Sequence, residues 1–243
     1  LNDILANIAK AEADANITGI FLDLSGIDAG IATVEEIRNA LLKFKKTGKF
    51  IVAYSSNYSQ KAYYLASVAD KLYMNPGGSV DFVGLSAQVM FYRNTLEKLD
   101  VKPEIIRHGR FKSAVEPFML DRMSPENREQ IRTYVGSIWD HIVSGIASSR
   151  HIGADTLNRF ADSLMLWNNG QAIRYGLLDT LLYRDQVLDT LARLTKTADA
   201  GDLELVSHQT YLRVPRNKTN KTYTRNKVAV IYAEGDIVMG DPG

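Results

Sequence analysis

The sequence predicts an α/β fold with a largely parallel sheet, followed by a helical carboxy-terminal portion. Over the first hundred residues, short apolar runs alternate with longer segments whose apolar residues recur at helical spacing. Such alternation is typical of parallel strands that are joined by crossover helices. From Ser124 onward helical spacing dominates, so we expect the rest of the fold to be helical.

The expected elements follow from apolar spacing and from turn residues. Helices are predicted where apolar residues recur every three or four positions, as Leu1, Leu5 and Ile8 do. Strands are predicted where short apolar runs are bounded by Gly, Pro, Asn or Ser. The expected helices cover residues 1–14, 33–47, 59–69 and 88–99. The expected strands cover residues 19–24, 50–54, 71–74 and 103–106, with turns at 25–30 and 75–78.

A long helix is expected to begin at Ser124. This serine suits the N-cap, Pro125 fits the first turn, and Glu126 suits the positive helix end. The spacing predicts that the helix continues to about Ser149. Further helices are expected over 154–160, 169–175 and 184–195, then a linker over 201–226, and then a strand from Val228.

Composition restricts the class of protein. The 243 residues suffice for one large domain or two small ones, and 45% hydrophobic with 23% charged residues is ordinary for a globular protein. A net charge of +1 argues against general nucleic-acid binding. The absence of cysteine excludes disulfides and thiolate metal sites. The chain opens on a helical pattern without Met, so we expect it to be a piece of something longer.

Six basic residues near the expected linker lie close together, with no acid between Glu204 and Glu234. Such a run fits contact with anionic lipid or nucleic acid, or a solvated interdomain linker. The linker is favoured because Asn and Thr are interleaved with the charges. The six residues are Arg213, Arg216, Lys218, Lys221, Arg225 and Lys227.

Three familiar kinds of site are not supported. The histidines are scattered without ligand spacing, so neither a metal nor a cofactor is expected. The loop 25–30 lacks both nucleotide-binding signatures, which favours a plain turn. No GxSxG elbow is present, so Ser55, Ser56 and Ser59 are assigned to helix capping. The histidines are His108, His141, His151 and His208.

One lysine lies in a setting that favours loss of its proton. Lys112 is expected between the apolar strand 103–106 and an apolar turn that Pro117 stops. A desolvated lysine is a base, and a base implies a nucleophile to activate. A lone lysine is more often a solvated surface group, and no convincing nucleophile appears elsewhere in the chain.

The residues around Lys112 resemble a known family. Residues 109–118 (GRFKSAVEPF) with 121–125 (DRMSP) closely resemble the lysine-bearing segment of long-form signal peptide peptidase A, or protease IV. Residues 57–67 resemble its central helix, and 172–179 resemble the Ala-x-x-x-Gly-Leu-x-Asp ending shared with Clp and crotonase relatives. The resemblance covers nearly all of residues 1–196 and implies a Clp/crotonase-like fold of repeated β-β-α units.

The resemblance implies part of a membrane-anchored serine endopeptidase with a Ser-Lys dyad, which degrades signal peptides after their release. In that family the amino-terminal domain supplies the lysine, and the carboxy-terminal domain supplies the serine and the oxyanion hole. Lys112 would be the general base. Residues 1–200 would form the lysine-bearing domain without its first strands, and 227–243 would begin a second, truncated repeat.

The same resemblance implies partners and a location. Signal peptides or other unfolded peptides would be substrates, and the protein would form homo-oligomers. It would lie at the bacterial cytoplasmic membrane, on the extracytoplasmic side, through an anchor that this chain lacks.

The chain also departs from the family's serine-bearing repeat. Gln60 falls where the nucleophile belongs, and Asp28 and Ala29 fall where paired glycines build the oxyanion hole. An aspartate there would repel a developing oxyanion. We therefore expect a degenerate half that is inactive alone. We also expect the strand 227–238 to fill the vacancy beside the first strand, in its own chain or in a neighbour.

Two other functions stay open. The first is a non-catalytic scaffold that oligomerises and binds peptide. Replacing Lys112 in the full-length protein distinguishes it, because a scaffold would keep its activity and a dyad base would not. A crotonase-type acyl-CoA enzyme shares the layered fold, but fold alone does not decide function. That chemistry also needs an oxyanion hole of backbone amides, which the segment at Asp28 disfavours.

Overall fold

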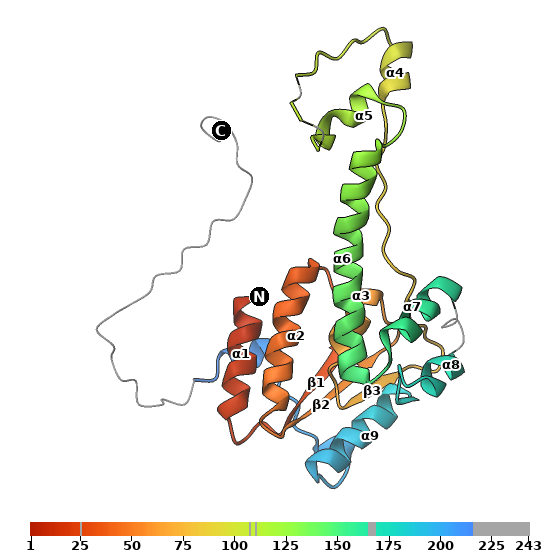
Figure 1. The fold of residues 1–243 in the computed structure, drawn as a ribbon. Coiled ribbons are helices and arrows are strands. Elements are labelled where there is room, and N and C mark those ends of the chain that lie inside the picture. The colour runs from red at the N-terminus through yellow and green to blue at the C-terminus, as the bar shows by residue number, and fades with distance from the viewer. Residues whose placement is uncertain (25, 107, 110, 165–168, 216–243) are drawn as a thin grey trace.

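The computed structural model describes residues 1–215 except 25, 107, 110 and 165–168. At its centre lies a parallel sheet with the strand order β1-β2-β3-β4. This confirms the predicted α/β class and the largely parallel sheet (Figure 1). The strands are β1 (Gly19–Leu24), β2 (Phe50–Ser55), β3 (Lys71–Met74) and β4 (Thr180–Leu181).

The side chains of β2 alternate between two cores, one on each face of the sheet. Ile51 and Ala53 belong to the larger core, whereas Val52 and Tyr54 belong to the smaller one. Helix α9 (Arg184–Thr195) covers the smaller core. The helices of the larger core are α1 (Asn2–Ala13), α2 (Ile31–Lys45), α3 (Gln60–Ala66), α6 (Pro125–Arg150), α7 (Ala154–Ser163) and α8 (Asn169–Arg174).

A buried arginine ties three of these helices together. Arg38 of α2 is 2% exposed, and burial lowers the pKa of its guanidinium. It donates to the carbonyl oxygens of Tyr64 in α3 (2.9 Å) and Gly145 in α6 (2.5 Å). It also donates to the hydroxyls of Ser67 and Ser149 at 3.0 and 2.7 Å. Because a buried cation is costly without such partners, these bonds fix α6 against α2 and α3.

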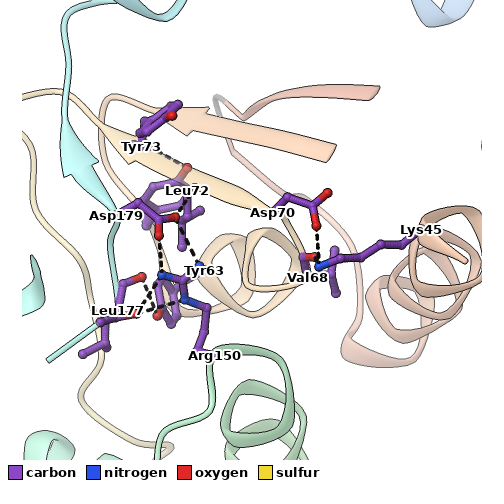
Figure 2. A network of polar contacts seen from close by, with 11 residues as sticks. Lys45, Tyr63, Val68, Asp70, Leu72, Tyr73, Arg150, Leu177 and Asp179 are labelled. Atoms are coloured by element: carbon purple, nitrogen blue, oxygen red, sulfur yellow. Dashed lines mark hydrogen bonds and ion pairs between the residues drawn. The ribbon is translucent and has the colours of Figure 1, made fainter. Parts of the chain in front are cut away.

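A second polar network joins the carboxy-terminal end of α6 to the sheet (Figure 2). Arg150 donates to the carbonyl oxygen of Gly176 at 2.8 Å and forms an ion pair with Asp179 at 3.3 Å. The same carboxylate accepts from the backbone N–H of Leu72 in β3 at 2.7 Å. Gly176, with φ +76°, lets the chain turn sharply after α8. The Gly-Leu-x-Asp ending therefore places β4 beside β3.

A short helix that the sequence pattern did not reveal lies within the expected linker. Helix α10 (His208–Leu212) packs on α1. Lys10, 8% exposed, donates to the carbonyl oxygens of Tyr211 and Val214, the latter at 2.9 Å. The Tyr211 hydroxyl donates to Asp14 at 2.8 Å. Five residues are too few to show helical periodicity, so only these long-range contacts identify the helix.

Two expected elements are wrong. The helix expected over 88–99 is only α4 (Arg93–Lys98), and the chain before it is extended. The strand expected over 103–106 is not formed, and Ile106 is fully exposed. An apolar run becomes a strand only where a neighbouring strand pairs with its backbone, and no described strand lies beside this one. The other helices and strands predicted within the described residues are present, with bounds shifted by a few residues, and the strand expected from Val228 lies outside those residues.

Residues 85–123, here called the arm, project from the body beside α6 (Figure 1). With 26 residues, α6 is about 39 Å long, and its first half lies away from the sheet. The arm carries α4, a 3-10 turn (Ser113–Val115) and α5 (Glu116–Met119). Its two legs join where the Tyr92 N–H donates to the Pro117 carbonyl at 2.7 Å.

Replacing Arg38 with Met should destabilise the fold by about 3 kcal/mol, because buried carbonyl oxygens would lose their donor. Urea unfolding of the purified chain measures this free energy. Lys46→Met, at an exposed site just after the same helix, is the matched control and should change stability by less than about 0.5 kcal/mol. Equal effects of the two replacements would contradict this role of Arg38.

Replacing each of two adjacent glycines in the turn after β3 with alanine should change the stability by different amounts. A Cβ on Gly78 would lie 1.9 Å from the carbonyl oxygen of Ser56, whereas one on Gly77 would lie no closer than 3.5 Å to its neighbours. Gly78→Ala should therefore cost at least about 2 kcal/mol of unfolding free energy. Gly77→Ala should be nearly neutral in the same urea experiment. A larger loss of stability for Gly77→Ala than for Gly78→Ala would contradict this geometry of the turn.

Candidate functional site

Lys112 lies on the arm, far along α6 from the sheet, just before the 3-10 turn that leads into α5 (Figure 1). The expectation that its own chain desolvates it is wrong, because the side chain is exposed. The strand that was to shield it does not form, and the neighbouring Phe111 is 54% exposed. Any apolar cover over this lysine must come from outside the described residues.

A fully buried carboxylate lies one turn after Lys112. Glu116 accepts hydrogen bonds from the Ser124 hydroxyl (2.5 Å), the Ser124 N–H (3.3 Å) and the Asn127 side-chain amide (2.9 Å). It thus places a negative charge at the positive N-terminus of α6. Sequence reasoning missed Glu116. An acid shortly before a Ser-Pro helix start is the signal that could have found it.

Gln60, expected at the nucleophile's position, is the first residue of α3. Its amide oxygen accepts from the N–H groups of Val83 (3.2 Å) and Gly84 (3.1 Å), and its amide nitrogen donates to the Gly84 carbonyl at 3.1 Å. A carboxamide has no nucleophilic oxygen comparable to a serine hydroxyl. The side chain instead holds the root of the arm against α3.

The loop expected at the oxyanion hole contacts the start of α3 through a carbonyl oxygen. The Lys61 ammonium donates to the carbonyl oxygen of Ala29 at 2.8 Å, so this loop presents an acceptor to the start of the helix. Asp28 is exposed. An oxyanion hole needs N–H groups aimed at the reacting oxygen, and a carbonyl in that place works against one.

The serines near α3 divide into one cap and two residues with other roles. Ser59 caps α3 by accepting from the Ala62 N–H at 3.3 Å, as expected. Ser55 does not cap: its buried hydroxyl donates to the carbonyl oxygens of Leu24 and Asn57, each at 2.6 Å. Capping was also wrong for Ser56, which is exposed and precedes the cap by three residues. The hydroxyl of Ser55 links two strand ends because β1 and β2 end side by side.

The histidines serve separate elements. His141 pairs with Glu35 at 3.3 Å, and the side-chain amide of Asn7 contacts Nδ1 of His208 at 2.8 Å. His151 caps the end of α6 in a left-handed conformation, and His108 is exposed. Within the described ranges, no three His, Asp or Glu side chains gather as metal ligands.

No helix in the described part of the chain is both long and apolar enough to cross a bilayer.

A groove of about 490 Å³ lies where the root of the arm passes α6. Its wall mixes apolar side chains with the charged Arg128, Arg132 and Asp162. Among the described residues, the backbone of 85–91 along one side makes no hydrogen bond. Such an unpaired extended edge can accept another extended chain. Further lining residues are Val83, Leu85, Ile131, Val135 and Trp139.

The amino-acid sequence is similar to those of known proteins. Residues 43–198 match the model of Peptidase family S49. The chain is 34% identical over 247 residues to Protease 4 of Haemophilus influenzae, covering 98% of this chain and 40% of that protein. Protease 4 of Salmonella typhi is 34% identical over 253 residues, covering 99% and 40%. The chloroplastic serine protease SPPA of Arabidopsis thaliana is 28% identical over 237 residues, covering 98% and 35%.

The chain thus spans well under half the length of these relatives. The parallel sheet with its covering helices agrees with the Clp/crotonase-like fold of the family. The identities extend over nearly all of the chain, and the family model covers more than half of it. This chain therefore belongs to peptidase family S49, the family of the serine proteases called protease 4 and signal peptide peptidase A.

Proposed function

We propose that this chain supplies Lys112 as the general base of a Ser-Lys serine protease whose nucleophile and oxyanion hole lie outside it. The observation that carries the proposal is the contrast between two sites. Gln60 at the start of α3 is a carboxamide bonded to the backbone of Val83 and Gly84, and the nearby carbonyl of Ala29 accepts from Lys61. Lys112 is exposed on an arm that reaches away from that position.

In the proposed reaction, neutral Lys112 takes the proton of a serine hydroxyl as that oxygen attacks the scissile carbonyl. Backbone amides of the second domain stabilise the tetrahedral oxyanion. The ammonium of Lys112 then returns the proton to the leaving amine, which leaves an acyl-enzyme for water to hydrolyse. The lysine must be neutral to begin, and apolar cover supplied on assembly favours that form.

The surface of the arm supports such an assembly. Met90, Leu99 and Ile106 are 64%, 67% and fully exposed, and exposed apolar side chains gathered in one region mark interaction sites. We propose that a second domain and further copies of the protein cover the arm, and that residues 103–106 pair as a strand only then. Other exposed apolar residues of the arm are Leu85, Val101, Phe111, Phe118 and Met119.

We further propose released signal peptides or other unfolded peptides as substrates. The groove beside α6 is consistent with an extended peptide, because apolar side chains line part of its wall and the backbone along one side is unpaired. By the family resemblance, the whole protein would be anchored in the bacterial cytoplasmic membrane and would work on its extracytoplasmic side. The expected strand 227–238 and most of the basic run lie outside the described residues and remain predictions.

A scaffold function is the second candidate, and the bonds of Gln60 favour it. They give Gln60 a structural role at the position where the resemblance places a nucleophile, which fits a domain that only builds the assembly. An acyl-CoA enzyme is disfavoured, because such chemistry needs a pair of backbone amide donors, whereas the segment at Asp28 and Ala29 carries an acid and a carbonyl bonded to Lys61.

Lys112→Ala in the full-length parent should lower kcat/KM for a fluorogenic peptide by about 10²–10⁴-fold, because the serine would lose its base. Lys102→Ala removes another exposed lysine of the same arm and should leave the rate unchanged. Full activity of the Lys112 variant would overturn the dyad and leave the scaffold function in place.

The isolated chain should cleave no peptide and should not react with a fluorophosphonate, since it has a base but no activated serine. Gln60→Ser should not change this, because the proposed base, Lys112, lies on the arm, which projects from the body. Mass spectrometry after labelling provides the measurement. Steady cleavage by the isolated chain that survives Lys112→Ala would refute the proposal.

A further inference from the structure

We propose that Glu116 is the positioning residue that holds Lys112 in place for proton transfer. This inference rests on the proposed role of Lys112 as a general base. No step of the reaction as described above uses Glu116, yet it is the one fully buried residue among the described positions of the arm after α4.

The burial of Glu116 contrasts with its surroundings. Its side chain is 0% exposed, whereas Lys112 and Ala114 before it and Phe118 after it are exposed. A carboxylate is kept in such a place only when donors surround it. The Ser124 hydroxyl, the Ser124 N–H and the Asn127 amide are such donors, at 2.5, 3.3 and 2.9 Å. The carboxylate therefore fastens the lysine segment to the start of α6.

A single turn of backbone joins this fastening to Lys112. Lys112 is the N-cap of the 3-10 turn Ser113–Val115, and Glu116 closes that turn because its N–H bonds to the Ser113 carbonyl. On the other side, the Pro117 carbonyl accepts from Tyr92, and the rings of Phe118 and Tyr92 stack 5.9 Å apart. A shift at Glu116 would thus be transmitted directly to the backbone of Lys112.

Helix α6 links this fastening to the body. Its far half is buried at Ile142, Val143 and Ile146, and Arg38 and Arg150 fix it there. At the arm end, the Ser124 hydroxyl donates to Glu116 and accepts from the Asn127 N–H at 3.1 Å. The position of Lys112 is therefore set relative to the sheet through one continuous helix. Precise placement matters, since a displacement of about 1 Å can cost about 10²-fold in rate.

The test uses the full-length parent with kcat measured per active site, counted by fluorophosphonate titration. Glu116→Ala removes the contacts with Ser124 and Asn127 and should lower kcat by about 10²-fold with KM unchanged. Glu116→Gln keeps the shape and one acceptor oxygen, so it should lose only about 10-fold. Glu104→Gln, at an exposed acid of the same arm, is the matched control and should leave kcat unchanged.

A double replacement separates positioning from general stabilisation. If Glu116 acts through Lys112, then adding Glu116→Ala to Lys112→Ala should not lower the residual rate of serine labelling any further. A further loss of rate in the Lys112→Ala background would overturn the inference. It would also be overturned if the single Glu116 variants changed KM or the fraction of titratable sites but left kcat unchanged. If Glu116→Ala does not fold, Glu116→Gln in the same cycle decides.

The inference and the function on which it rests fail in different ways. Full activity of the Lys112→Ala variant would refute the role of Lys112 as general base and, with it, the positioning role of Glu116. Loss of activity after Lys112→Ala, together with an unchanged kcat for both Glu116 variants, refutes the positioning role alone.

Discussion

The attachment of α6 to the body is the constraint on which the rest of the structure depends. Arg38 reaches from α2 through the core to the carbonyl of Gly145, and Arg150 ties the end of the helix to the turn at Gly176 and to Asp179. Burying a charge is costly unless hydrogen-bond partners surround it, so these arginines favour the one geometry in which their partners are in place. The half of α6 beyond these contacts carries the arm, so the position of Lys112 depends on two arginines far from it.

Two side chains at the start of α3 have structural roles. Gln60 binds the backbone at the root of the arm, and Lys61 holds the loop after β1 through the carbonyl of Ala29. Both side chains satisfy backbone groups, which stabilises this part of the domain. In the proposed function the serine lies elsewhere, so these structural roles do not conflict with that of Lys112.

The arm differs from the body in what completes it. In the body, apolar side chains are covered by the helices on either face of the sheet. On the arm, Leu99 and Ile106 face outward, and residues 103–106 have no strand beside them among the described residues. The chain spans about two fifths of its protease 4 relatives, and a second domain and further copies of the protein are the cover that we propose for the arm.

The sequence by itself determined the class of fold, nearly every element of the body and the family, because local spacing, capping residues such as Ser124 and a contiguous motif around Lys112 are properties of neighbours in the chain. Only the tertiary structure decided the rest. It showed that residues 103–106 remain unpaired, that Lys112 is exposed, and that α10 lies on α1. It also showed that Gln60 and Glu116 hold the arm. The physical reason is that strand pairing, burial and long-range hydrogen bonds depend on partners distant in sequence, which no local pattern can name.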